Sequence, residues 1–285
     1  MWIALALICA LSLAGSDALT KSALNRGAGA ATLGWLRIAL SVPFTLPLLL
    51  FIDMPLLDMT FWTALLAAMP FEVLAMVLYA KALKESPLSL TLPFLSLTPV
   101  FLLVVGWLIL GETIPARGMA GIALITVGGY ALNFSHKKYG WLGPVRAIGR
   151  EPGSVKMIVV SLLFSVTASL LKLGIEHSSA LFYASVYYAV TAIVAIPAAS
   201  ISGLRSLPRA DYPKLAGAGI LMALMLVTNM VAIELAKVAY VISIKRTSML
   251  FGAFIGWLVF RESGIRERLT GAALMLAGFA IIVLS

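Results

Sequence analysis

The residues with the clearest capacity for chemistry are two adjacent cations, Lys245 and Arg246, in the apolar stretch 239–260. Two hydroxyl residues, Ser243 and Ser248, flank them. A guanidinium presents a planar fork of donors and an ammonium adds a mobile point charge, so the pair suits a carboxylate or a phosphate. The pair begins about 9 Å into a helix by the helical rise, too deep for both side chains to reach water past lipid. We therefore predict that these four residues bind an anionic group.

One acidic residue, Glu72, lies about 18 Å along another apolar segment by the same rise, and it is the obvious partner for the pair. A single carboxylate cannot neutralise two cations. Two interpretations stay open: the excess positive charge binds an anionic substrate, or the charges form a purely structural ion network. Glu72 either orients Lys245 or, because burial favours a protonated carboxyl group, carries a coupling proton.

A second stretch, residues 87–110, carries prolines with hydroxyl residues between them. Proline removes a backbone hydrogen bond and bends a helix, and the carbonyl groups that it frees need new partners. We expect Pro93 and Pro99 to shape this helix around the substrate. The other polar residues that we expect at the substrate site are Thr91, Ser96, Asn229 and Tyr187. Tyr187, with its neighbours Tyr183 and Tyr188, fits an interfacial aromatic belt equally well.

Metal and covalent chemistry are not predicted. The single cysteine, Cys9, lies in an apolar stretch, and His136 and His177 stand apart without clusters of acids or thiols. Such clusters are what a metal site or a nucleophile triad requires. The sequence therefore predicts no metal, no cofactor and no enzymatic activity.

The elements that must position these residues are membrane helices. The chain has 285 residues, of which 61% are hydrophobic and only 12% charged, and its mean hydropathy is +1.04. Soluble domains have about 45–50% apolar and about 25% charged residues. A spanning helix needs about 20 apolar residues, so the length allows about ten crossings and no soluble domain. We predict an all-α integral membrane protein with helices near residues 2–20, 33–52, 60–80, 87–110, 115–134, 157–175, 180–201, 215–235, 239–260 and 266–284.

The two halves of the chain repeat each other. Residues 101–134 align without a gap on residues 251–284, and the shared residues include paired tryptophan and glutamate as well as a Gly-x6-Gly pattern. The identical pairs are Phe101/Phe251, Gly106/Gly256, Trp107/Trp257, Leu108/Leu258, Glu112/Glu262, Gly121/Gly271, Ala123/Ala273, Leu124/Leu274 and Gly128/Gly278. Because five crossings are an odd number, the second half enters the membrane inverted. We predict two inverted five-helix repeats, residues 1–135 and 157–285, joined by a loop at 136–156. The paired glycines are expected to mark helix-packing faces.

The distribution of the basic residues predicts the orientation. The formal net charge is +9, and on the predicted topology fifteen basic residues lie on the side of the 136–156 loop, against only Arg117 and Lys237 on the other side. Cytoplasmic loops carry the excess of Lys and Arg, so both termini are predicted outside the cytoplasm, and nucleic acid is not implied. Arg37 and Lys172 lie near helix ends, so two interpretations of these side chains stay open: they snorkel to the interface, or they have a functional role.

The chain resembles the drug/metabolite transporter superfamily, specifically its ten-helix EamA-type members. The resemblance rests on the Pro-rich helix, the Gly-Glu at its end and the following Gly-x6-Gly within residues 86–130, together with their echo at 239–279. It implies a secondary transporter with a central cavity lined by the third, fourth, eighth and ninth helices. Lys245 and Arg246 also resemble the Lys-Arg pair with which the plastid phosphate translocators hold a phosphate. Most family members keep both termini in the cytoplasm, so the charge-based orientation departs from the family.

We therefore expect a multi-pass carrier of the plasma or inner membrane that moves a small polar metabolite, bearing a carboxylate or phosphate, by alternating access. Its partners would be that small molecule, the lipid bilayer and a proton or counter-substrate. One alternative is an exporter of amino acids or other organic solutes in which the basic pair is internally neutralised. Another is a lipid translocase or scaffold subunit.

Overall fold

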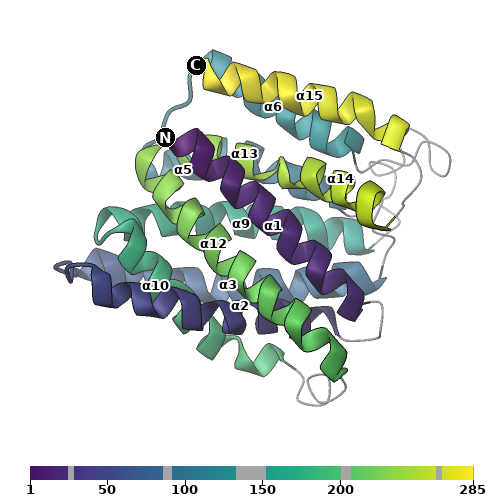
Figure 1. The fold of residues 1–285 in the computed structure, drawn as a ribbon. Coiled ribbons are helices and arrows are strands. Elements are labelled where there is room, and N and C mark those ends of the chain that lie inside the picture. The colour runs from purple at the N-terminus through teal and green to yellow at the C-terminus, as the bar shows by residue number, and fades with distance from the viewer. Residues whose placement is uncertain (25–28, 86–91, 133–151, 200–206, 261–264, 285) are drawn as a thin grey trace.

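A computed structural model describes residues 1–24, 29–85, 92–132, 152–199, 207–260 and 265–284. Every regular element in these ranges is helical (Figure 1). Seven segments are long and apolar enough to cross a bilayer, and three shorter apolar helices complete ten crossings. The first repeat contains α1 (Trp2–Leu24), α2 (Ala30–Thr45), η1 (Leu46–Phe51), α3 (Met59–Glu85), η2 (Leu92–Leu97), α5 (Thr98–Leu110) and α6 (Ala116–Leu132). The second contains α9 (Pro152–Glu176), α10 (Ala180–Val194), η3 (Ile196–Ala198), η4 (Arg209–Asp211), α12 (Tyr212–Leu235), α13 (Val238–Lys245), α14 (Ser248–Phe260) and α15 (Ile265–Val283).

The element boundaries repeat with the offset that the sequence predicted. The starts of α1 and α9, of α2 and α10, of η1 and η3, and of α5 and α14 each lie 150 residues apart. The start of α3 and that of η4, which leads into α12, show the same offset. The repeat therefore extends over both halves of the chain.

The two repeats are inverted relative to each other. The N- and C-termini lie together at one end of the bundle, which we call the terminal end (Figure 1). Helix α1 starts at this end, whereas its repeat mate α9 finishes there, with Lys172 bonded to the loop after α12. Helix α9 begins at Pro152, five residues before the predicted start at 157, so residues 152–156 of the expected loop are helical. The other residues of that loop, 136–151, lie outside the described residues.

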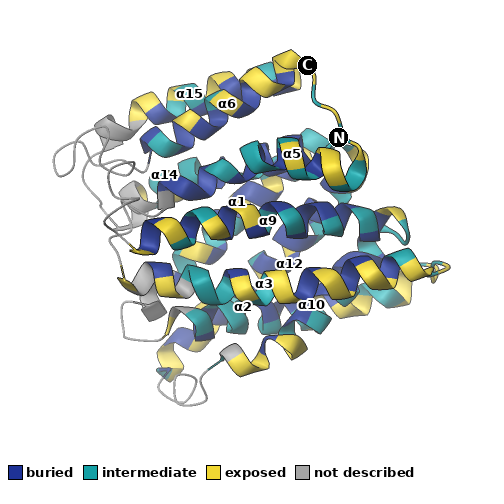
Figure 2. Cartoon of the chain, turned by 180° about the vertical axis from the view of Figure 1, so that it is seen from behind, coloured by how far each residue is buried: buried dark blue, intermediate teal, exposed yellow. Residues whose placement is uncertain are grey.

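The packing partners follow the same symmetry. Helix α1 packs against α12, and the mates of these two helices, α9 and α3, pack against each other. In the same way α5 packs on α9, and α14 on α1. Buried residues line the inward faces of these helices, whereas exposed residues face outward (Figure 2). The centre of the bundle is thus built from equivalent helices of both repeats.

The outermost layer is formed by α6 and α15, which touch through the paired glycines (Figure 1). A Cβ atom added to Gly128 would lie 2.7 Å from the backbone oxygen of Gly271, and one added to Gly121 would lie 2.9 Å from that of Gly278. Without side chains at these points the two backbones come close enough for the van der Waals packing that joins membrane helices. The predicted packing role of the Gly-x6-Gly patterns is confirmed.

The predicted continuous helix over 239–260 is interrupted. Helix α13 ends at Lys245 and α14 begins at Ser248, with a tight turn between them in which the Thr247 amide donates to Ile244 O at 2.9 Å. The turn contains neither proline nor glycine. Its repeat mate is the junction between η2 and α5, where the 3₁₀ segment gives way to the α-helix at Thr98. Both central helices are therefore discontinuous at equivalent positions.

Candidate functional site

Lys245 and Arg246 lie at the interruption of the ninth membrane segment. Lys245 is the last residue of α13, and Arg246 caps that helix by donating its backbone amide to Ile242 O and Ser243 O, each at 3.1 Å. Both side chains are partly buried and keep some accessible surface. The helix break thus places two cationic groups at one turn inside the bundle.

The Arg246 guanidinium is held by a residue of the opposite repeat. Its Nη2 donates to Thr98 Oγ1 at 2.7 Å, whereas its Nε is buried without a hydrogen-bond partner. Within the described ranges Arg246 forms no ion pair with an acid. Within the described part of the chain, Thr98 is therefore the one residue that occupies a side-chain donor of this guanidinium.

Lys245 has no hydrogen bond and no ion pair to any described residue. Glu72 lies within electrostatic range of the Lys245 ammonium, but its carboxylate oxygens are more than 4.0 Å from Nζ, too far for an ion pair. Cys9 of α1 is a second neighbour in electrostatic range. Among the described residues, the ammonium therefore has neighbours in electrostatic range but no bonded partner.

Glu72, from α3, is bonded to neutral hydroxyl groups instead. Its Oε2 accepts a hydrogen bond from the Tyr187 hydroxyl of α10 at 3.1 Å. Tyr187 stacks on Tyr183 with ring centroids 5.6 Å apart, and Tyr183, Tyr187 and Tyr188 are all buried. These tyrosines form an internal aromatic column, so the interpretation as an interfacial belt is wrong.

The remaining predicted polar site residues lie in different surroundings. Ser243 and Ser96 are buried and donate to carbonyl oxygens of their own segments, Ala239 and Pro93, each at 2.6 Å. Asn229 of α12 is also buried, and its Oδ1 lies 3.6 Å from Cys9 Sγ. Ser248 starts α14 beside Arg246. Thr91 lies outside the described residues.

The two prolines lie where a helix tolerates them. Pro93 is in the 3₁₀ segment η2, and Pro99 occupies the first turn of α5, where its missing amide hydrogen would have no intrahelical partner. The carbonyl group of Leu95, freed near this junction, accepts a hydrogen bond from Thr98 Oγ1 at 2.9 Å. The prolines are thus part of the junction that presents Thr98 to Arg246.

Two other cations inside the bundle are satisfied by the protein. Arg37 pairs with Asp17 of α1. Lys172 donates to Ile233 O at 2.7 Å, reaches two further carbonyl oxygens at the end of α12, and pairs with Glu176 at 3.6 Å. Neither side chain needs to snorkel, and both differ from Lys245 and Arg246 in having acidic partners.

Loops at the terminal end of the bundle are joined by polar contacts. Glu112, after α5, accepts a hydrogen bond from the Val238 amide at 3.0 Å, and Lys237 donates to the carbonyl oxygen of Thr113. Glu234 accepts from the Ala180 amide at 3.1 Å. Partial burial raises the pKa of Glu112, although the Val238 amide favours its ionised form.

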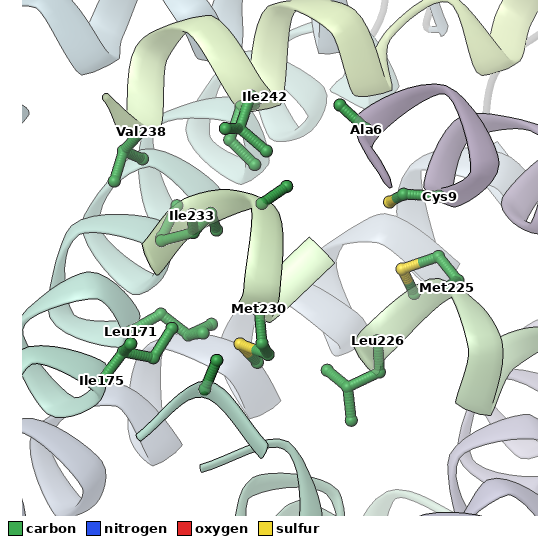
Figure 3. Packing of buried hydrophobic residues seen from close by; sticks show 14 of the residues in the cluster. Ala6, Cys9, Leu171, Ile175, Met225, Leu226, Met230, Ile233, Val238 and Ile242 are labelled. Carbon is green, nitrogen blue, oxygen red and sulfur yellow. The ribbon is translucent and has the colours of Figure 1, made fainter. Parts of the chain in front are cut away.

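Below these loops, hydrophobic side chains of four helices pack together. Figure 3 shows Cys9 of α1, Ile175 of α9, Met230 of α12 and Ile242 of α13 in this cluster, which belongs to the main core. Ile242 lies one turn before Arg246. The cluster therefore fills the bundle between these four helices, one turn from the basic pair.

A cleft of about 350 Å³ opens on the outer side of these loops. Its walls include Trp2, Lys237 and Tyr240, and Lys245 and Arg246 are not among them. Trp2 stacks on Tyr240 with ring centroids 6.4 Å apart. The cleft thus borders the start of α13, whereas the basic pair lies at its end.

Two contacts of the site were not predicted from the sequence. In the sequence, Thr98 is one of several hydroxyl residues in a Pro-rich stretch, and Cys9 is a single cysteine in an apolar stretch. Their partners, Arg246 and Asn229, lie 148 and 220 residues away. The repeat offset could have indicated Thr98, because it places Thr98 at the position equivalent to Ser248, next to the basic pair.

Comparison with known proteins agrees with this architecture. A family model described as the EamA-like transporter family matches residues 1–134 and 152–284. One solved structure, described only as the crystal structure of a protein, has a TM-score of 0.74 to this chain at 15% sequence identity. The alignment covers 99% of this chain and 96% of the other, and at that identity it concerns the fold alone. No curated protein is significantly similar to the chain in sequence.

Proposed function

Because the chain belongs to the EamA-like transporter family, we propose that it is a secondary carrier that moves a small anionic metabolite by alternating access. The transported molecule carries a carboxylate or a phosphate. Lys245 and Arg246 bind that group at the interruption between α13 and α14. Broken helices near the bilayer midplane are typical binding sites of secondary transporters.

The observation that carries this proposal is the contrast between the paired and unpaired cations of the bundle. Arg37 and Lys172 have acidic partners, whereas Lys245 and Arg246 have none among the described residues. Leaving charges unpaired in a membrane interior is costly unless they face water or a ligand. An anionic substrate supplies the missing partner.

This contrast also weighs against the exporter of amino acids or organic solutes with an internally neutralised basic pair. That alternative requires acids bonded to Lys245 or Arg246. Glu72, an acid within electrostatic range of Lys245, is bonded to Tyr187 instead. We therefore keep the anion carrier as the proposed function.

Alternating access is supported by the inverted repeat and by the contacts that join loops of both repeats at the terminal end. At the terminal end, loops of both repeats are joined through Glu112 and Lys237, above the cluster of Figure 3. We propose that these contacts form the closed gate of this conformation. Rocking the repeats, residues 1–135 and 157–285, about the site would open it.

Glu72 gives the proposed site a variable charge. With Glu72 ionised, the group of Lys245, Arg246 and Glu72 carries one net positive charge; with Glu72 protonated, it carries two. Its hydroxyl partner Tyr187 can hydrogen-bond either form of the carboxyl group, because a tyrosine hydroxyl both donates and accepts. We propose that Glu72 takes up the coupling proton.

A ligand screen tests the proposal. Purified protein is heated with pools of anionic, zwitterionic, neutral and cationic metabolites, because a ligand that binds only the folded state raises its apparent stability. We expect the hits to come from the anionic pools. The matched variant is Lys245→Met/Arg246→Gln, which removes both charges and leaves shorter side chains in their place.

In that variant the anionic hits should no longer shift the melting temperature. Anionic hits that persist in the variant would remove the proposed site. Hits confined to neutral or cationic pools would contradict the substrate class.

A further inference from the structure

Arg246 depends on the first repeat for its placement, although it belongs to the second. Its one side-chain hydrogen bond to a described residue runs from Nη2 to Thr98 Oγ1, at 2.7 Å. Thr98 is 1% exposed and starts α5, which makes it the residue at which the fourth membrane segment changes from a 3₁₀ to an α-helix. The bond therefore joins the two helix interruptions directly.

The Thr98 hydroxyl is itself fixed. It donates its single proton to Leu95 O at 2.9 Å, so only its lone pairs remain for Arg246. Pro99 restrains the following backbone torsion, and Leu95 lies in the short segment between Pro93 and Pro99. The acceptor that meets Arg246 is thus held by the backbone of the Pro-rich junction.

This arrangement divides the donors of the guanidinium. Nη2 is occupied by a neutral hydroxyl group, Nε is buried, and Arg246 still keeps accessible surface next to Lys245. An arginine with several rotatable bonds loses much conformational entropy when it binds a ligand, and a fixed hydrogen bond removes part of that loss in advance. A neutral acceptor also leaves the positive charge uncompensated for the ligand.

We infer that Thr98 is the positioning residue of the anion site: it holds Nη2 of Arg246 so that the free part of the guanidinium and the Lys245 ammonium face the same anion. This inference rests on the proposed function. Each half of the carrier then contributes to one site, the second repeat by its charges and the first by the acceptor that orients them. Movement of one repeat against the other changes anion affinity through this bond.

The test compares Thr98→Val, which keeps the shape of the side chain and removes the hydroxyl group, with Thr98→Ser, which keeps the hydroxyl group. Dissociation constants of inorganic phosphate and of succinate are measured by thermal shift on purified full-length protein. A matched control is Thr126→Val, since Thr126 is buried in α6 and its hydroxyl group donates only to Ile122 O of the same helix, at 2.9 Å.

We expect Thr98→Val to weaken binding of the better probe about tenfold, which is the usual effect of losing a hydrogen bond to a charged group. Thr98→Ser and Thr126→Val should bind within about twofold of the wild type, a margin well below that of one hydrogen bond. The melting temperature without a probe reports any general loss of stability. If Thr98 had a purely structural role, Thr98→Val would lower this melting temperature without weakening the binding of the probe.

Three results would overturn the inference. Wild-type affinity in Thr98→Val, combined with loss of binding in Lys245→Met/Arg246→Gln, removes the role of Thr98 and leaves the anion site standing. Equal weakening in Thr98→Ser excludes the hydroxyl group as the cause. Failure of both probes to bind the wild type, or unchanged binding in the double variant, removes the anion site itself and the inference with it.

Discussion

At the scale of single residues, the molecule distinguishes cations by their partners. Lys172 is held by Glu176 and by carbonyl groups, and Arg37 pairs with Asp17. Among the described residues, one neutral hydroxyl group, that of Thr98, is bonded to the side chains of Lys245 and Arg246. Residue type alone does not separate these two cases, because the difference lies in what the fold brings within bonding distance.

Glu72 is the residue on which proton coupling depends in this account. Replacement by glutamine keeps an acceptor for Tyr187 and removes the ionisable group. We expect uptake driven by an imposed pH gradient to lose its dependence on that gradient in Glu72→Gln reconstituted into liposomes. Tyr187→Phe, which keeps the carboxyl group, should retain the dependence; an unchanged gradient response in Glu72→Gln would instead assign the coupling to another group.

Asp58 gives a pH-dependent prediction outside the membrane segments. Hydrogen bonds from the Phe61 amide, at 2.9 Å, and from His177 lower the pKa of Asp58 below its ordinary value. A carboxyl group with a lowered pKa stabilises the fold above its ordinary value of about 4 and loses that effect as the pH falls through the lowered value. Asp58→Asn should therefore melt below the wild type at pH 7, and the gap should close in acid.

The neighbouring loop residue Asp53 is the matched control for this experiment. Asp53→Asn changes the same charge on the same loop, and Asp53 forms no helix-capping hydrogen bond to a described residue. A gap for Asp58→Asn that widens on acidification would show that the Phe61 and His177 contacts do not stabilise the carboxylate.

At the scale of elements, the close contact between α6 and α15 makes a stability prediction. A Cβ atom on Gly271 would lie 2.4 Å from the backbone nitrogen of Leu132 and 2.7 Å from Gly128 O, so the helices must separate. Gly271→Ala is expected to cost about 1–3 kcal/mol of folding free energy, the usual range for overpacking. Gly252→Ala is the control, because its Cβ atom would meet nothing within 4 Å.

The control should melt at or slightly above the wild-type temperature, since alanine favours a helix over glycine by about 1 kcal/mol or less. Equal melting temperatures for Gly271→Ala and Gly252→Ala in the same detergent would mean that α6 and α15 do not pack through their backbones.

How far the sequence predicts each element depends on whether its signal is local. Ten apolar segments and the offset between Trp107 and Trp257 are visible without coordinates, and they predict the helices and the repeat. The break after Lys245 was missed, because no proline or glycine marks it. The signals for this break were a run of polar residues from Lys245 to Ser248 and the repeat mate at Thr98. The apolar stretch as a whole predicted one continuous helix.

The substrate site is less predictable than the helices for the same reason. Glu72 and Tyr187 were both proposed for the site, and the structure joins them by a hydrogen bond. The bond of Thr98 to Arg246 depends on how two repeats pack, and hydropathy carries no information about that. Ser243 and Ser96, chosen for their hydroxyl groups, donate to carbonyl groups of their own segments instead.

At the scale of the whole molecule, the positive-inside rule predicts that the terminal end faces away from the cytoplasm. In a Cys9→Ser background, Met54→Cys places a thiol in the exposed loop before α3, at that end. A membrane-impermeant maleimide should label it in intact cells. A cysteine placed within residues 137–156 should react only after permeabilisation, and the reverse pattern would invert the orientation.

The central claim is that an anion crosses the bundle through Lys245 and Arg246. The most direct measurement is exchange of an anionic hit from the ligand screen across liposomes that contain either the wild type or Lys245→Met/Arg246→Gln, at equal amounts of folded protein. The account predicts rapid exchange by the wild type and none above protein-free liposomes by the variant. Exchange of the same anion at the wild-type rate by the variant would contradict it.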